Sequence, residues 1–402
     1  MKILTIGFAF RVAVAIVLLS KLASGQTVVK PTYTSLTEEA EKGKKELEEV
    51  RIKHSGETKV YFAERRSATG ATSKHRVVDF AWKEIAVKLF NMETGEVRII
   101  KVKRAGPDLV NVAKNFTLEV EERPSGLRWN SFNTPFKVTK PEGWVVIANK
   151  YRVRLSNGRY RDVIYSPYST SLHNQEMVAE GKKYLRDTLK QSFAELDRLG
   201  QGVSAKFLLD LKSEWLVDVM ERLVLIEHTD PFDANQFKEG KLELSPYERV
   251  LTIIAVNRDG AYVKTSSPAR ASGLMQYTGR TWELIRARYR WAKLPSFSNG
   301  VGNHIQSMKA AVLLHNHNLT EMARVLGPDI SSDPNLEHYL AAAYNGGVGP
   351  VIQAVVAHRK TGNDWRKELR KRKRTSESLD YMDKLDFLIS QRWLDLPIWG
   401  VF

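Results

Sequence analysis

The spacing of hydrophobic residues changes once along this chain, near residue 170. From Lys59 to Pro167, hydrophobic and polar residues alternate in short stretches, and glycine-containing turn sequences separate these stretches. Alternation places successive side chains on opposite faces of a strand, so this part is predicted to be a small antiparallel β-rich domain. Its expected strands include Val97–Val102, Phe116–Val120, Trp144–Ala148 and Tyr151–Leu155.

From Ser171 onward, hydrophobic residues recur every three or four positions, which is the spacing of one face of an α-helix. A charged segment near the N-terminus, Ser35–Arg51, is predicted to form a further helix because opposite charges lie three or four residues apart. The predicted fold class is therefore α+β and multidomain, with a β-rich domain followed by a mostly α-helical one. The expected helices after residue 171 include Leu185–Leu199, Lys206–Ile226 and Arg249–Val256.

The 402 residues, of which 43% are hydrophobic, are enough for two or three packed domains. The predicted order is a signal peptide at 1–25, a charged helical segment at 26–58, the β-rich domain at 59–167, a helical linker or subdomain at 168–244, a second helical domain at 245–390, and a tail at 391–402.

The first residues have the pattern of an export signal. A basic start precedes the apolar run Val12–Leu19, and the small residues Ala23–Gly25 allow cleavage before Gln26. Arg11 interrupts the apolar stretch, so an uncleaved membrane anchor and a cytoplasmic N-terminus are the alternatives. We expect an exported protein that is periplasmic or extracellular, and membrane-anchored if the leader is uncleaved.

The chain is basic and contains no cysteine. Its formal net charge is +16, and most of that charge remains if the leader, which carries three cations and no acid, is removed. A basic protein is attracted to polyanions, and outside the cytosol these are anionic wall polymers rather than nucleic acid. The densest basic run is Arg366–Arg374, for which a solvated helix face and a polyanion contact are both open interpretations.

Four short segments of the helical part attract attention for their chemistry. Each alone is a weak signal, because short apolar or glycine-containing sequences recur by chance. The segments are a hydrophobic helix and turn at Arg249–Tyr262, SPARASGLMQ at Ser267–Gln276, AAAYNGGVG at Ala341–Gly349, and ESLDY at Glu377–Tyr381. Together and in this order, they resemble the soluble lytic transglycosylase family, which is goose-lysozyme-like, over about a third of the chain.

The resemblance implies a cell-wall enzyme. Members of this family cleave the β-1,4 bond between N-acetylmuramic acid and N-acetylglucosamine in peptidoglycan and form a 1,6-anhydro product. One carboxylic acid first protonates the glycosidic oxygen and then acts as a base, while the acetamido group of the substrate assists. Such an acid must remain protonated at working pH, so it is expected in an apolar pocket. No cofactor is implied.

The family places its catalytic glutamate at the end of a helix, and no glutamate ends the helix Arg249–Val256. One alignment puts Asp259 in that place, keeps a carboxyl group, and is preferred here. The other puts Asn257 there, and an amide cannot deliver the proton. If Asp259 is instead an ordinary turn residue beside Gly260, the catalytic acid is absent.

The remaining site residues are transferred from the family motifs. Tyr344 is expected to face the catalytic carboxyl, and Glu377 and Tyr381 to close the far side of the cleft. The full set of expected substrate-binding residues is Ser267, Gly273, Leu274, Met275, Gln276, Tyr344, Asn345, Glu377 and Tyr381. For Leu274 and Met275, packing in the core is an equally good interpretation. No metal site is expected, because His315 and His317 point to different faces of a helix.

Two functions of different class follow from the sequence. The first is a lytic transglycosylase, slow if aspartate replaces glutamate. The second is a catalytically inactive relative that binds peptidoglycan as a wall-docking or structural part of an envelope complex. A fold turned entirely to protein–protein contact is a third, outside case. In each of the first two, the expected partner is the glycan strand, and no nucleic-acid partner is expected.

Overall fold

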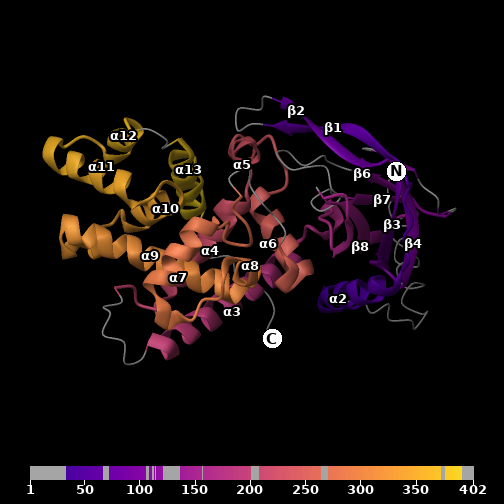
Figure 1. Cartoon of the computed structure of the whole chain (residues 1–402), viewed down its shortest axis with the longest axis horizontal. Coiled ribbons are helices and arrows are strands. Elements are labelled where there is room, and N and C mark those ends of the chain that lie inside the picture. The colour runs from indigo at the N-terminus through magenta and orange to yellow at the C-terminus, as the bar shows by residue number, and fades with distance from the viewer. Residues whose placement is uncertain are drawn as a thin grey trace, which may run out of the picture.

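The computed structural model describes residues 33–66, 72–105, 108–110, 113, 115–120, 136–155, 157–200, 208–263, 270–372 and 376–391. The predicted α+β architecture is confirmed: antiparallel strands occupy residues 58–165, and a mostly helical part occupies residues 175–390. Figure 1 shows the strands and α2 (Tyr33–Glu49) at one end of the molecule and the later helices at the other.

Five antiparallel strands form the main sheet, in the order β5-β4-β3-β8-β9. Two separate hairpins accompany it, one formed by β1 with β2 and the other by β6 with β7. The bounds are β1 (Thr58–Arg66), β2 (Thr72–Phe80), β3 (Lys83–Asn91), β4 (Val97–Ala105), β5 (Asp108–Val110), β6 (Thr117–Val120), β7 (Phe136–Lys140), β8 (Trp144–Arg154) and β9 (Tyr160–Tyr165).

One strand replaces two that were predicted. Trp144–Ala148 and Tyr151–Leu155 were expected to be separate, but β8 runs through Asn149 and Lys150 without a break. The polar pair does not end the strand because its backbone pairs with β3 on one side and β9 on the other. The buried ammonium of Lys150 donates to the carbonyl oxygen of Glu48 at 2.6 Å, which satisfies part of its hydrogen-bonding need.

Helix α2 covers one face of the sheet. Its side chains Leu36, Ala40 and Leu47 are buried against β3 and β8. Lys88 in the middle of β3 is fully buried on this face, and its amine donates to Glu39 at 3.2 Å and to Glu46 at 2.8 Å. These two ion pairs fix α2 across the sheet and supply partners for a buried charge.

The helical part contains eleven α-helices among the described residues, joined by short turns. Helices α3 and α6 approach closely, because a Cβ atom on Gly181 would lie 2.0 Å from the carbonyl oxygen of Leu251. The bounds are α3 (Gln175–Gly200), α4 (Glu214–His228), α5 (Pro231–Lys238), α6 (Pro246–Asn257), α7 (Gly279–Arg288), α8 (Phe297–Gly300), α9 (His304–Leu326), α10 (Leu336–Gly346), α11 (Val348–Thr361), α12 (Trp365–Arg370) and α13 (Ser376–Ser390). Short 3₁₀ turns occur at Thr170–Leu172, Arg258–Gly260, Arg290–Ala292 and Pro328–Ser332.

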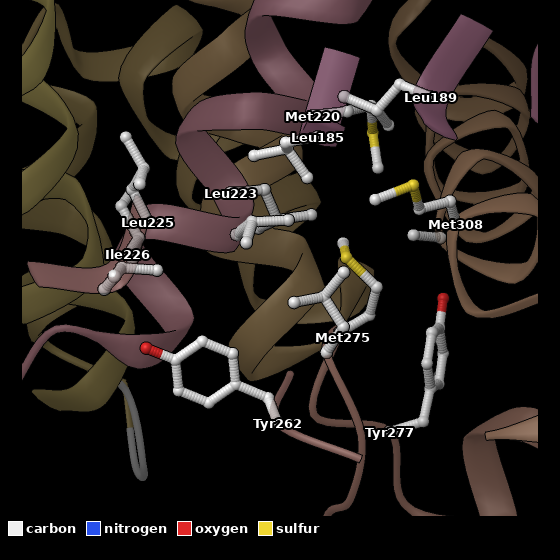
Figure 2. Packing of buried hydrophobic residues seen from close by; sticks show 14 of the residues in the cluster. Leu185, Leu189, Met220, Leu223, Leu225, Ile226, Tyr262, Met275, Tyr277 and Met308 are labelled. Carbon is white, nitrogen blue, oxygen red and sulfur yellow. The ribbon is translucent and has the colours of Figure 1, made fainter. Parts of the chain in front are cut away.

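A single hydrophobic cluster joins the helices to one face of the sheet. Side chains of α3 and α4 belong to it together with those of α6, α9, α10 and α13. Figure 2 shows this packing, with Leu185 and Leu189 from α3 near Met220 from α4 and Met308 from α9. The segment 168–244, which is predicted to be a helical linker or subdomain, contributes to the same core as the helices after residue 245.

Two further expectations concern the ends and the membrane. The predicted signal peptide, residues 1–25, and all but the first residue of the predicted tail, 391–402, lie outside the described residues. The predicted helix Lys206–Ile226 is shorter, since α4 begins only at Glu214. In the described ranges, no helix combines the length and hydropathy that crossing a membrane requires.

Candidate functional site

A tight loop, Ser272–Tyr277, contains most of the expected binding residues of the second motif. The backbones of Ser272 and Tyr277 pair by two hydrogen bonds of 2.9 and 3.0 Å. Gly273 has a φ of +78°, and a Cβ atom there would lie 2.2 Å from the carbonyl oxygen of Val301. Gln276 also has a positive φ, 45°, and its side-chain amide donates to the carbonyl oxygen of Gly273 at 2.8 Å. Gly273 and Gln276 therefore shape the loop.

Leu274 and Met275 pack into the core, as one of the two interpretations predicted. Both are fully buried, and Figure 2 shows the Met275 side chain pointing toward Met220 and Met308. Their backbone carbonyl oxygens contact side chains of two other segments. The carbonyl oxygen of Leu274 lies 2.7 Å from Nε2 of His228, and the hydroxyl of Tyr344 donates to the carbonyl oxygen of Met275 at 2.6 Å.

These contacts bring the loop to the C-terminal end of α4. His228 is the last residue of α4, and its ring stacks on Tyr262 with a centroid distance of 3.7 Å. Burial lowers the pKa of His228 to about 3, so its ring is neutral and Nε2 donates to the Leu274 carbonyl. The residue before it, Glu227, is thereby held beside the Ser272–Tyr277 loop.

Glu227 is the acid of this site that the sequence analysis did not identify. Part of the residue is open to solvent, but protein atoms surround its carboxyl group. Burial raises the pKa of Glu227 to about 7, and nearby Glu377 acts in the same direction. A hydrogen bond from Tyr381 and the charge of Lys384 oppose the rise. A carboxyl that keeps its proton near neutral pH can serve as a general acid.

Three tyrosines accompany Glu227: Tyr277 from the loop, Tyr344 from α10 and Tyr381 from α13. The pKa of each is raised well above its ordinary value, first by burial and further by the charge of Glu227. The rings of Tyr277 and Tyr344 meet edge to face at 5.9 Å. The Tyr381 hydroxyl is buried and has no partner with full hydrogen-bond geometry, so its contact with Glu227 is loose.

The first turn of α13 lies against the end of α10. A Cβ atom on Gly346 would approach Oγ of Ser378 closely, so glycine permits this packing. Asn345 and Glu377 are both exposed there, and Oγ of Ser378 lies 3.5 Å from Oδ1 of Asn345. The structure therefore brings the third and fourth motifs together beside Glu227.

The two residues proposed for the acid occupy other surroundings. Asn257 is buried, and its amide bonds both backbone groups of Ser166 at 2.8 and 2.9 Å. Asp259 is exposed in the turn Arg258–Gly260 and accepts a hydrogen bond of 2.5 Å from Tyr184. In the described part of the chain, neither residue bonds to Tyr344 or Tyr381. Asn257 thus serves to fix α6 to the strand end.

A signal for Glu227 was present in the sequence. The run Leu223–Glu227 (LVLIE) is hydrophobic and ends on a glutamate at the end of a helix. The sequence analysis missed it because α5 and α6 separate it from the GLMQ segment, and because it lies in the segment 168–244, outside the predicted domain 245–390 that carries the motifs. Ser267, the one expected site residue not yet placed, lies outside the described residues.

Chemically, the arrangement offers one proton-carrying carboxyl surrounded by tyrosines and by a loop whose backbone is held in place. Across the described ranges, no group of three or more His, Asp or Glu residues could hold a metal ion. His304 and His315 are buried and lie against backbone carbonyls of Ala261 and Ala311. No protein-family model and no curated protein matches the chain.

Proposed function

We propose that this protein is a lytic transglycosylase that cleaves the β-1,4 bond between N-acetylmuramic acid and N-acetylglucosamine, with Glu227 as its acid. The observation that carries the proposal is the raised pKa of Glu227 at the meeting point of three sequence motifs. The resemblance to soluble lytic transglycosylases assigns Tyr344 to face the catalytic carboxyl. Among the described residues, Glu227 is the carboxyl group whose charge raises the pKa of both Tyr344 and Tyr381.

The position of Glu227 in the chain agrees with this role. It is the penultimate residue of α4, and the family places its acid at the end of a helix. The contact of His228 with the Leu274 carbonyl and that of Tyr344 with the Met275 carbonyl connect this helix end to the GLMQ loop. We therefore propose Glu227, and not Asp259, as the catalytic acid. Asp259 lies in an exposed turn and accepts a hydrogen bond from Tyr184.

The reaction needs one group that is first an acid and then a base. The protonated carboxyl of Glu227 gives its proton to the glycosidic oxygen as the bond from this oxygen to muramic C1 breaks. The acetamido oxygen of the same sugar bonds to C1. The carboxylate then takes the proton of the muramic 6-hydroxyl, whose oxygen displaces the acetamido oxygen and closes the anhydro ring. No water is consumed, and Glu227 ends protonated.

A pKa near neutrality suits both steps. At a pH close to that pKa, the acid form and the carboxylate are both accessible, so neither proton transfer is strongly uphill. The basic net charge of +16 further supports a substrate in an anionic wall. We propose accordingly that the protein acts outside the cytosol, where peptidoglycan and anionic wall polymers occur.

The test is digestion of purified peptidoglycan by the full chain and by Glu227→Gln, with released muropeptides identified by mass spectrometry. Glu176→Gln, which replaces an exposed glutamate in the first turn of α3, is the matched control. We expect anhydro-muropeptides from the unsubstituted protein and the control, and none from Glu227→Gln. If all three proteins pellet with the wall but release nothing, the protein is a non-catalytic wall-binding relative and the proposal is wrong.

A further inference from the structure

A buried lysine lies directly behind the proposed acid. Lys384 in α13 is 6% exposed, and its amine donates to the carbonyl oxygen of Ile226 at 2.7 Å and to that of Thr229 at 2.9 Å. Ile226 immediately precedes Glu227, and Thr229 follows it by two residues. The two hydrogen bonds therefore bracket Glu227 along the backbone.

The last carbonyls of a helix have no partner within the helix and carry partial negative charge. At the end of α4 the chain turns to extended backbone at Thr229, so other groups must bond these carbonyls. A neutral donor could do so, but the ammonium adds a positive charge that complements the helix dipole. Burying an ammonium is costly without partners, so Lys384 and the end of α4 depend on each other.

We propose that Lys384 is a positioning residue that holds the C-terminal turn of α4, and with it the carboxyl group of Glu227, in the geometry for proton transfer. This inference rests on the proposed function of Glu227. One helix, α13, then supplies both Tyr381, which contacts the carboxyl loosely, and Lys384, one turn further along, which fixes the backbone behind it.

The charge of Lys384 has a second consequence, because it stabilises the carboxylate form of Glu227. Burial and Glu377 favour the protonated form, and Lys384 limits that effect. A carboxyl without this cation would still be an acid, but it would be slow to form the carboxylate needed for ring closure. The other titratable or charged groups that interact with this pair are Tyr277, Tyr344, Tyr381, His228, Asp230, Asp380 and Lys238.

The test uses Lys384→Met and Lys384→Gln in the full chain. Methionine removes both the charge and the donor, whereas glutamine removes the charge but keeps N–H donors for a carbonyl on a somewhat shorter side chain. Lys309→Met is the matched control, because Lys309 is an equally buried lysine that donates to Glu195 and not to the α4 end. Circular dichroism establishes that each variant is folded, and Lys384→Gln carries the test if Lys384→Met does not fold.

The first readout is the titration of the Glu227 carboxyl by carbon-13 NMR, assigned by its loss in Glu227→Gln. We expect both Lys384 variants to raise the midpoint by about one pH unit, and Lys309→Met to leave it unchanged. The second readout is the pH profile of muropeptide release, whose alkaline limb should move in the same direction. In Lys384→Met the maximal rate should also fall by about tenfold or more, because the acid is displaced.

An unchanged midpoint in a folded Lys384 variant overturns the proposal, even if its activity or stability has fallen. The titration needs no substrate, so it tests the role of Lys384 separately from the transglycosylase function. A shifted midpoint in a protein that releases no muropeptides supports the coupling of Lys384 to Glu227 and rejects the transglycosylase function. An unshifted midpoint in an active enzyme rejects the positioning role of Lys384 and leaves the transglycosylase function standing.

Discussion

The hydroxyl of Tyr344 donates a hydrogen bond of 2.6 Å to the backbone carbonyl of Met275, a residue 69 positions earlier in the chain. Met275 is fully buried and belongs to the GLMQ loop, whereas Tyr344 lies in the third motif on α10. The bond gives this carbonyl a partner and connects the two motifs beside Glu227. Phenylalanine could fill the same space but could not make this connection.

Tyr344→Phe is expected to lower both stability and cleavage. Loss of the hydroxyl leaves the Met275 carbonyl without its donor, which costs about 1–3 kcal/mol in unfolding free energy. Urea unfolding with an unchanged slope would measure this loss. Tyr160→Phe is the matched control, because Tyr160 is 53% exposed. Removing the hydroxyl of an exposed tyrosine leaves no buried group without a hydrogen-bond partner. Equal stability of the two variants would show that the Tyr344 bond contributes nothing.

Gly273→Ala should be strongly destabilising. The positive φ disfavours any side chain there, and the added Cβ atom would lie 2.2 Å from the Val301 carbonyl oxygen. The combined cost of the backbone conformation and the overlap is about 2–4 kcal/mol. Gly260→Ala is the control, because Gly260 lies outside the positive-φ set and an added Cβ would meet open space. A loss in Gly273→Ala no larger than that in Gly260→Ala would contradict the strained-loop interpretation.

Glu227→Gln should become more stable than the unsubstituted protein as pH rises. Burial raises the pKa of Glu227 above its ordinary value of 4.5, so the folded state binds this proton more tightly than the unfolded chain. The unfolding free energy of the unsubstituted protein therefore falls as pH rises from the ordinary value through the folded-state pKa. Glutamine does not titrate, so the variant escapes that loss.

Thermal unfolding of both proteins across this pH range measures the effect. The melting temperature of Glu227→Gln should exceed that of the unsubstituted protein at alkaline pH, by roughly 1–2 °C for each kcal/mol. The difference should shrink as the pH falls toward the ordinary glutamate value. A difference that is independent of pH would mean that the carboxyl of Glu227 titrates normally.

Much of the fold could be predicted from local pattern. Alternation identified the β-rich part, and three- to four-residue spacing identified the core of α3 and most of α4, because each pattern reflects which face of the element is buried. The continuity of β8 through Asn149 and Lys150 could not be predicted in this way. Partners distant in sequence make it possible: β3 and β9 pair with the backbone of both residues, and the Glu48 carbonyl accepts a hydrogen bond from the Lys150 amine.

The sequence predicted only part of the site, because a local pattern does not show which distant residues pack together. The motif residues Gly273, Gln276, Tyr344 and Tyr381 stand out in the sequence because their identity matters locally or recurs in a motif. Glu227 belongs to a helix that two intervening helices separate from the nearest motif, and only packing brings it beside Tyr344 and Tyr381. The role of Lys384 depends on two backbone carbonyls of α4, which no side-chain pattern reveals.

The most direct test of the account compares two carboxyl groups in one assay. The initial rate of anhydro-muropeptide release should be measured for the unsubstituted protein, Glu227→Gln and Asp259→Asn at one pH near neutrality. We expect Glu227→Gln to lose about 10²–10⁴-fold in rate, and Asp259→Asn to remain within a few-fold of the unsubstituted protein. Full activity in Glu227→Gln, or loss of activity in Asp259→Asn alone, would contradict the account.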